Sequence, residues 1–219
     1  MRKYDSVIWD WNGTLLDDVG LAVGIVNELF TEYGVPPLTQ CRYKEIFDFP
    51  VRLYYERAGL DFQKHDFRQV SEKFCTRFEE RVHSANLFSE VPGVLETVRQ
   101  AGVRQFILSG TEQQALHRMV TRYGLASLFD TARGLDDHLA AGKFGAGHDL
   151  VDRYQIQTNR AVMIGDTAHD AEVARELGIE CLLVATGHHS PERLSGLGFP
   201  VFDSLSALSP NLFSSGFVS

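Results

Sequence analysis

The chain has 219 residues, of which 44% are hydrophobic and 23% charged, so it can build the core of an ordinary globular protein. Its formal net charge is −8 and its lysines and arginines form no cluster, which argues against a nucleic acid or an anionic membrane as the main partner. The three cysteines lack a CxxC pair and no apolar run approaches the ~18 residues of a membrane span, so neither a disulfide framework, a structural zinc site nor membrane insertion is indicated.

Short apolar segments alternate with helical patterns along most of the chain. Strands are predicted at residues 6–9, 103–108, 161–164 and 180–184. Each is apolar on both faces, which is typical of a parallel sheet covered by helices. Helical patterns follow at residues 92–102, 111–124 and 168–178, each ending on a glycine, which is a common helix stop. This alternation predicts an α/β fold with a doubly wound, Rossmann-like parallel sheet.

The interval from Asp17 to Ser89 departs from this alternation. Leu21, Ile25 and Leu29 recur every four residues on one helical face, further helical patterns follow, and no strand-like run interrupts them. About seventy residues is far longer than the roughly 2 to 6 residues of a normal βα loop. We therefore predict an inserted all-helical cap domain at residues 17–89 and an α/β core domain formed by residues 1–16 and 90–219.

Polar residues follow three of the predicted strands directly. The first strand leads to Asp10, the second to Ser109 and Gly110, and the third to Asp166, with Asp170 one helical turn later. Ligands of open parallel sheets bind beyond the carboxyl ends of the strands. We therefore expect these side chains to converge at one edge of the sheet.

Asp10 and Asp166 at neighbouring strand ends form a pair of like charges that raise each other's pKa unless a cation lies between them. Magnesium is the natural candidate, because it prefers oxygen ligands and is usually held by one or two carboxylates plus phosphate oxygens. Gly13 allows a tight turn whose amides can cradle a phosphate, and Lys143 can supply further positive charge.

This set of residues, in this order, resembles the haloacid dehalogenase superfamily of aspartate-nucleophile hydrolases. The similarity covers nearly the whole chain, with "DWNGT" as the first motif, Ser109 as the second, Lys143 as the third and "GDTAHD" as the fourth. The helical insertion directly after the first motif looks most like the capped branch that contains phosphoglycolate phosphatases. The resemblance implies a magnesium-dependent phosphatase that hydrolyses a small phosphorylated metabolite.

The resemblance also implies a role for each residue. Asp10 would attack phosphorus and form an aspartyl-phosphate. Magnesium would be held by Asp10, by the backbone carbonyl of Asn12 and by Asp166, with Asp170 ordering the waters of the metal. The residues expected to bind the phosphate are Gly13, Thr14, Ser109, Gly110 and Lys143.

Asn12 departs from the phosphatase pattern, which has a carboxyl there as general acid and base. An amide can donate a hydrogen bond but cannot transfer a proton, and such transfer is typically worth ~10² to 10⁴ in rate. Three interpretations follow. The enzyme is slow or specialised for substrates with good leaving groups; another residue, His169, His188 or His189, supplies the acid; or the protein is a phospho-ligand-binding sensor with little turnover. The simpler expectation is that His169 lies on a helix surface and that His188 and His189 lie in a solvated loop.

In the predicted cap, Arg52 is the residue that we expect to contact the non-reacting end of the substrate, because a guanidinium can hold a carboxylate at two points. Ser109 is also expected to cap a helix that begins near Thr111. The N-terminal segment meets an aspartate too early for a signal-peptide core, so we expect a cytoplasmic protein. We further expect a monomer or homodimer whose partner is the metabolite, with no nucleic acid and no membrane.

Overall fold

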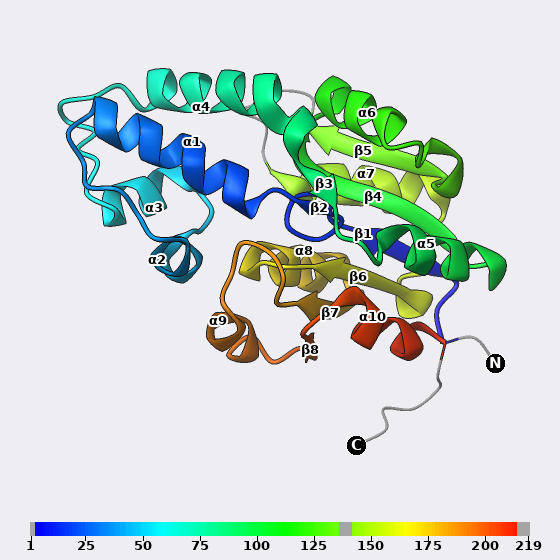
Figure 1. The fold of residues 1–219 in the computed structure, drawn as a ribbon. Coiled ribbons are helices and arrows are strands. Elements are labelled where there is room, and N and C mark those ends of the chain that lie inside the picture. The colour runs from blue at the N-terminus through cyan, green and yellow to red at the C-terminus, as the bar shows by residue number, and fades with distance from the viewer. Residues whose placement is uncertain (1–2, 136–141, 214–219) are drawn as a thin grey trace.

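A six-stranded parallel sheet forms the centre of the computed structural model, which describes residues 3–135 and 142–213 (Figure 1). Its strands, in the spatial order β5-β4-β1-β6-β7-β8, are β5 (Thr131–Leu135), β4 (Arg104–Glu112), β1 (Ser6–Trp9), β6 (Ala161–Gly165), β7 (Glu180–Val184) and β8 (Val201–Phe202). The strand order reverses at β1, which lies between β4 and β6. The prediction of a doubly wound parallel sheet is therefore confirmed.

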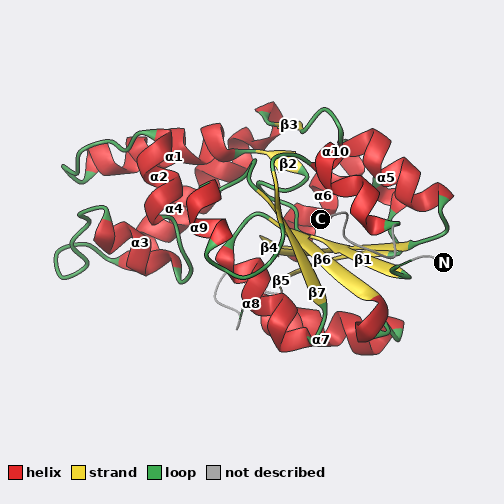
Figure 2. Cartoon of the chain, turned by 90° about the horizontal axis from the view of Figure 1, so that it is seen from below, coloured by secondary structure: helices red, strands yellow, loops and turns green. Residues whose placement is uncertain are grey.

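Helices cover both faces of this sheet. Figure 2 shows one layer above it and another below it. The first layer contains α5 (Val91–Gln100), α6 (Gln113–Arg122) and α10 (Leu205–Leu208), and the second contains α7 (Lys143–Tyr154), α8 (Ala168–Leu177) and α9 (Pro191–Ser195). In β1, Val7 and Trp9 pack against the first layer while Ile8 packs against the second. Because both faces are buried, the central strands read as continuous apolar runs.

The two edge strands were not predicted from the sequence. In β5 only Gly134 is fully buried, and both residues of β8 are half-exposed, so neither strand has the apolar run that marks β1, β6 and β7. β4 continues to Glu112, whose carboxylate accepts from the backbone N–H groups of the first turn of α6. The prediction that Ser109 caps a helix beginning near Thr111 is therefore wrong, because Glu112 provides the cap.

Four helices lie between β1 and α5 and pack on one another around their own apolar cluster. They are α1 (Val19–Glu32), α2 (Gln40–Ile46), α3 (Val51–Arg57) and α4 (Phe67–Arg81). At the two ends of this segment, the two-residue strands β2 (Leu16–Asp17) and β3 (Asn86–Leu87) pair with each other in an antiparallel fashion. Short 3-10 helices span Val82–Ser84, Ala126–Leu128, Thr158–Arg160 and Ser209–Leu212.

The predicted periodicity of α1 agrees with its packing, since Ile25 and Leu29 are buried in the cluster that α1 to α4 share. The division into a core domain and a cap domain at residues 17 and 89 stays a prediction, and we use the word cap for α1 to α4. Within the described ranges, no helix combines the length and the apolar character that crossing a bilayer requires.

The Leu29→Ala substitution should test the apolar cluster of the cap. The Leu29 side chain is fully buried, so its truncation should lower the free energy of unfolding by about 2 to 5 kcal/mol, measured by urea denaturation. Leu53 in α3 is 43% exposed, and Leu53→Ala should change the same quantity by no more than about 0.5 kcal/mol. Equal effects of the two variants would contradict the packing described here.

Candidate active site

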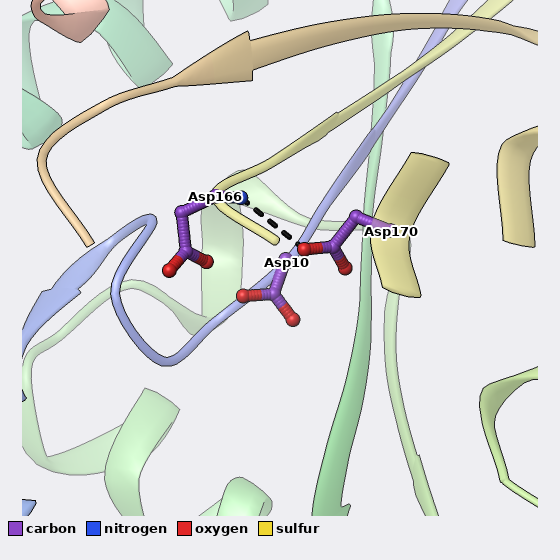
Figure 3. Close-up of side chains that lie close together, drawn as sticks. All are labelled: Asp10, Asp166 and Asp170. Atoms are coloured by element: carbon purple, nitrogen blue, oxygen red, sulfur yellow. Dashed lines mark hydrogen bonds between the residues drawn. The ribbon is translucent and has the colours of Figure 1, made fainter. Parts of the chain in front are cut away.

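Three aspartates meet at the carboxyl ends of two adjacent strands. Asp10 follows β1, Asp166 follows β6, and Asp170 lies in the first turn of α8 (Figure 3). One carboxylate oxygen of each lies within 4.8 Å of the other two. All three side chains are buried, and even Asp10 is only 5% exposed. The structure therefore brings positions 10 and 166 together, as a shared divalent ion requires.

Lys143, the first residue of α7, lies against this acidic cluster. Its buried ammonium donates to Asp10 Oδ1 and, at 2.6 Å, to Asp170 Oδ1. Burial lowers the pKa of Lys143, but the Asp10 and Asp170 carboxylates raise it further, so the side chain stays charged. Burial raises the pKa of Asp10 well above its ordinary value, although Lys143 opposes that shift. Lys143 and Asp10 are therefore in direct contact.

Asp170 fixes the turn between β6 and α8. Its Oδ2 accepts from the hydroxyl of Thr167 at 2.7 Å and from the backbone N–H groups of Thr167 at 3.0 Å and Asp166 at 3.2 Å. The Thr167 hydroxyl in turn accepts from the Asp170 backbone, which completes a capping box. Burial raises the pKa of Asp170, but Lys143 and these hydrogen bonds outweigh that effect and lower it. Asp170 therefore orients the backbone that carries Asp166.

Asp166 is held by two further segments. Its Oδ1 accepts from the Thr14 hydroxyl at 3.0 Å, and its Oδ2 accepts from the backbone N–H of His188 at 2.6 Å. A β-carbon added at Gly187 would lie 2.0 Å from Oδ2, and one added at Gly13 would lie 2.3 Å from it. Burial raises the pKa of Asp166 to about 6, while the charge of His188 opposes the shift. The two glycines therefore permit the close approach that buries this carboxylate.

The cluster has the chemistry of a site for a hard divalent cation. Among the residues that the structure describes, it presents oxygen ligands only, and its three carboxylates outnumber the one ammonium, that of Lys143, which contacts them. Burial raises the pKa of both Asp10 and Asp166 despite the charges of Lys143 and His188, so ionised carboxylates are unfavourable there without a further cation. A cation placed between those two carboxylates would compensate their charge.

The residues expected to cradle a phosphate fall into two groups. The Gly13 amide already donates to Asp18 Oδ1 at 2.8 Å and to the Leu16 carbonyl at 2.9 Å, and the Thr14 hydroxyl is used by Asp166. Their expected role as phosphate donors stays a prediction; in this structure the Gly13 amide holds the loop and the Thr14 hydroxyl holds Asp166. Ser109 is the last of five consecutive buried residues of β4, and Gly110 beside it is exposed. Their role in binding phosphate stays a prediction.

The Asn12 side chain is fixed at both ends of its amide. Its Nδ2 donates to Asp18 Oδ2 at 2.9 Å, and its Oδ1 accepts from the Thr111 hydroxyl at 2.8 Å. Asp18 was missed by the sequence reasoning, because its position before α1 resembles that of a helix N-cap. It makes no side-chain cap hydrogen bond, and its buried carboxylate turns instead to the loop of residues 12 and 13. An aspartate at position 12 would face this carboxylate.

The expectation that His188 and His189 lie in a solvated loop is wrong, because both are buried. His188 Nε2 lies 3.3 Å from Asp18 Oδ1, and His188 Nδ1 lies 2.9 Å from the Tyr43 hydroxyl. Burial lowers the pKa of His188, but Asp18 and Asp166 raise it to about 9. His189 accepts from the Ala168 amide at 3.1 Å, and burial lowers its pKa to about 4.

His169 lies between two phenylalanine rings. Its ring centroid is 5.0 Å from that of Phe49 in the cap and 5.3 Å from that of Phe144 in α7, and its side chain is half-buried. It is therefore less exposed than an ordinary position on a helix surface. These contacts place it at the boundary between cap and core, beside Lys143 rather than against Asn12.

The structure gives Arg52 partners away from the acidic cluster. Its Nε donates to Glu56 at 3.0 Å, and its guanidinium lies over the rings of Phe62 and Phe67 within the cap. Other cap residues reach the core, among them Tyr43, Phe47 and Phe49. The expectation that Arg52 contacts the substrate stays a prediction, which these partners within the cap do not favour.

Comparison with known proteins places this geometry in context. The sequence profile of the haloacid dehalogenase-like hydrolases matches residues 7–184. The chain is 26% identical to a phosphoglycolate phosphatase of Synechococcus elongatus, with 86% of this chain and 87% of that protein covered. It is 25% identical to an N-acetylmuramic acid 6-phosphate phosphatase of Pseudomonas aeruginosa, with 87% and 85% covered. The crystal structure of a predicted phosphatase from Clostridium acetobutylicum has the same fold, with a TM-score of 0.82 at 17% identity over 95% of this chain and 98% of that one.

Replacing His188 by glutamine should change the dependence of stability on pH. The pKa of His188 is about 9 in the folded chain and about 6.5 in an unfolded one, so its charge stabilises the fold fully below pH 6.5 and is lost as the pH rises through 9. Without metal, the difference in unfolding free energy between the wild type and His188→Gln should fall by about 3 kcal/mol between pH 6 and pH 10. Urea denaturation in a chelating buffer measures it, and a difference independent of pH would rule out a charged His188.

Proposed function

The chain belongs to the haloacid dehalogenase-like hydrolases, and we propose that it is a magnesium-dependent phosphatase that acts on a small phosphorylated metabolite. The observation that carries the proposal is the position of Asp10, whose carboxylate lies with Asp166 and Asp170 within 4.8 Å and is bound by Lys143. The similarity to phosphatases of phosphoglycolate and N-acetylmuramic acid 6-phosphate supports a phosphate monoester as the substrate.

Asp10 is the proposed nucleophile. Lys143 holds Oδ1, which leaves Oδ2 to attack phosphorus. A new bond forms between Oδ2 and phosphorus while the ester bond from phosphorus to the leaving oxygen breaks, and the leaving oxygen takes the electron pair. In the second step, water attacks the phosphorus of the aspartyl-phosphate, which releases phosphate and restores the Asp10 carboxylate. Each step is simpler than direct hydrolysis of the ester.

The remaining residues position the reacting groups and balance their charge. Asp10, Asp166 and the backbone carbonyl of Asn12 would hold Mg²⁺, which offsets the negative charge on the transferring phosphoryl group when bound. Asp170 keeps Lys143 and the turn before α8 in place. Ser109, Gly110 and Lys143 would bind the non-bridging phosphate oxygens, as positioning and electrostatics dominate phosphoryl transfer.

Asn12 makes the proposed enzyme slow on simple alkyl phosphates or specialised for substrates with good leaving groups. Its amide is committed to Asp18 and Thr111, so it neither transfers a proton nor is free to turn toward the substrate. The leaving group of an acyl phosphate or a phosphoanhydride departs as a stable anion, so its release does not require a general acid. A phospho-ligand sensor would share the acidic cluster but would not need the nucleophile.

An assay of phosphate esters, acyl phosphates and pyrophosphate with magnesium, against an Asp10→Asn control, tests the proposal. Loss of the nucleophile should reduce turnover of the best substrate by about 10³-fold or more, since the aspartyl-phosphate cannot form. Calorimetric binding of inorganic phosphate to both proteins separates binding from chemistry. If phosphate binds but no compound is turned over above the control, the protein is a sensor and the proposal fails.

The Asn12→Asp substitution should increase hydrolysis of ordinary phosphate monoesters, and the double variant Asn12→Asp/Asp18→Asn should increase it further. The single variant sets two carboxylates where a 2.9 Å hydrogen bond now lies, while the double variant restores one amide and one carboxylate. We expect the double variant to gain about 10²-fold, within the usual range for general acid catalysis. Steady-state rates measure it, with Asp18→Asn alone as the control. No gain in either variant would show that another group already supplies the proton.

A further inference from the structure

The acidic cluster is closed to solvent in this structure. Asp10, Asp166, Asp170 and Lys143 are all buried, so a phosphate group can reach Asp10 only after the side chains above it are displaced. Cap residues at the carboxyl end of α2 lie against the core loop that joins β7 to α9. This loop is drawn in orange beside α2 in Figure 1. The contacts of that loop therefore determine how the cap is seated.

Arg193 in α9 binds the carboxyl end of α2. Its Nη1 donates to the backbone carbonyls of Phe47 and, at 3.2 Å, Lys44, and its Nη2 lies 3.4 Å from Asp48 Oδ2. A cation is favoured at this end of a helix, where unpaired carbonyls carry partial negative charge. The guanidinium geometry allows one side chain to serve several acceptors at once. Arg193 thus clamps the last turn of α2 and the two residues beyond it, Phe47 and Asp48.

The same core loop contacts Asp166 on its other side. The backbone N–H of His188 donates to Asp166 Oδ2, and Gly187 packs directly against that oxygen. From the cap, the Tyr43 hydroxyl bonds to the His188 ring and Lys44 Nζ donates to the Thr186 carbonyl at 3.2 Å. Residues 186–189 therefore lie between the end of α2 and the Asp166 carboxylate.

We infer that Arg193 is a positioning residue that couples the seating of the cap to the placement of Asp166. By clamping the end of α2, Arg193 holds Tyr43 against His188 and so keeps the loop of residues 186–189 pressed onto the carboxylate. Release of the clamp loosens that loop and leaves Asp166 less fixed for binding a cation. The inference rests on the proposed function only in assigning Mg²⁺ to Asp166.

A second ion pair between cap and core provides a matched control. Arg118 in α6 pairs with Glu79 in α4, and these side chains are 57% and 60% exposed. The Arg193 side chain is only 24% exposed and also binds backbone carbonyls. Exposed ion pairs contribute little because water and salt screen them. Loss of Arg118 should therefore leave both the cap and Asp166 as they are.

The experiment compares Arg193→Gln, Arg193→Lys and Arg118→Gln with the wild type. Hydrogen exchange of backbone amides in residues 40–49 reports the seating of the cap, and calorimetric titration with Mg²⁺ alone reports the state of Asp166. Arg193→Gln should speed exchange and weaken Mg²⁺ binding, each by about 10-fold, since apparent affinity falls with the fraction of molecules in the competent state. Arg193→Lys, which keeps a charge that can reach one carbonyl, should recover part of both effects. Arg118→Gln should remain within about twofold of the wild type in both.

Each contrary result has a distinct meaning. Faster exchange in Arg193→Gln with unchanged Mg²⁺ affinity would overturn the coupling, and unchanged exchange would overturn the clamp. Equal effects of Arg193→Gln and Arg118→Gln would show a general loosening and would also overturn the inference. A wild-type protein that binds no Mg²⁺ would instead overturn the assignment of the metal to Asp166, and with it the proposed function, while the exchange measurement would still judge the clamp.

Discussion

Burial of three carboxylates around one ammonium is the constraint on which the rest of the site depends. Like charges in a poorly solvated corner repel strongly, so each carboxylate must be compensated or its pKa rises. Lys143 compensates Asp10 and Asp170, while Asp166 relies on the charge of His188 and on backbone and hydroxyl donors. Those donors come from separate segments that reach the carboxylate only because glycines lie beside it. The parallel sheet brings these segments to one edge.

The amide at position 12 suits its surroundings. Asp18 lies where it accepts a hydrogen bond from Asn12, and the same carboxylate accepts from the Gly13 amide and faces the charged His188 ring. A carboxylate therefore lies beside the first loop, on Asp18, six residues after Asn12 in the chain. This arrangement stabilises the loop and keeps a second negative charge at position 12 unfavourable.

The sequence was most informative where local pattern and burial coincide. The central strands are buried on both faces and were predicted, as were Asp10 and Asp166 at their ends, whereas the half-exposed edge strands β5 and β8 carry no such pattern. Tertiary contacts made away from the strand ends could not be predicted from the sequence. Nothing in the spacing of Asp18 or His188 reveals that they meet, and the donors of Gly13 and Thr14 could be assigned only once their partners were known.

The paired strands β2 and β3 lie where the chain leaves the sheet for α1 and where it returns from α4. Because both crossings are tied together by one two-residue ladder, the helices beyond them are attached at a single narrow pivot. Such an attachment permits rotation about one axis far more readily than sliding or separation. Because the Tyr43 hydroxyl meets the His188 ring across the boundary between cap and core, a rotation at these two connections would change the separation of that pair.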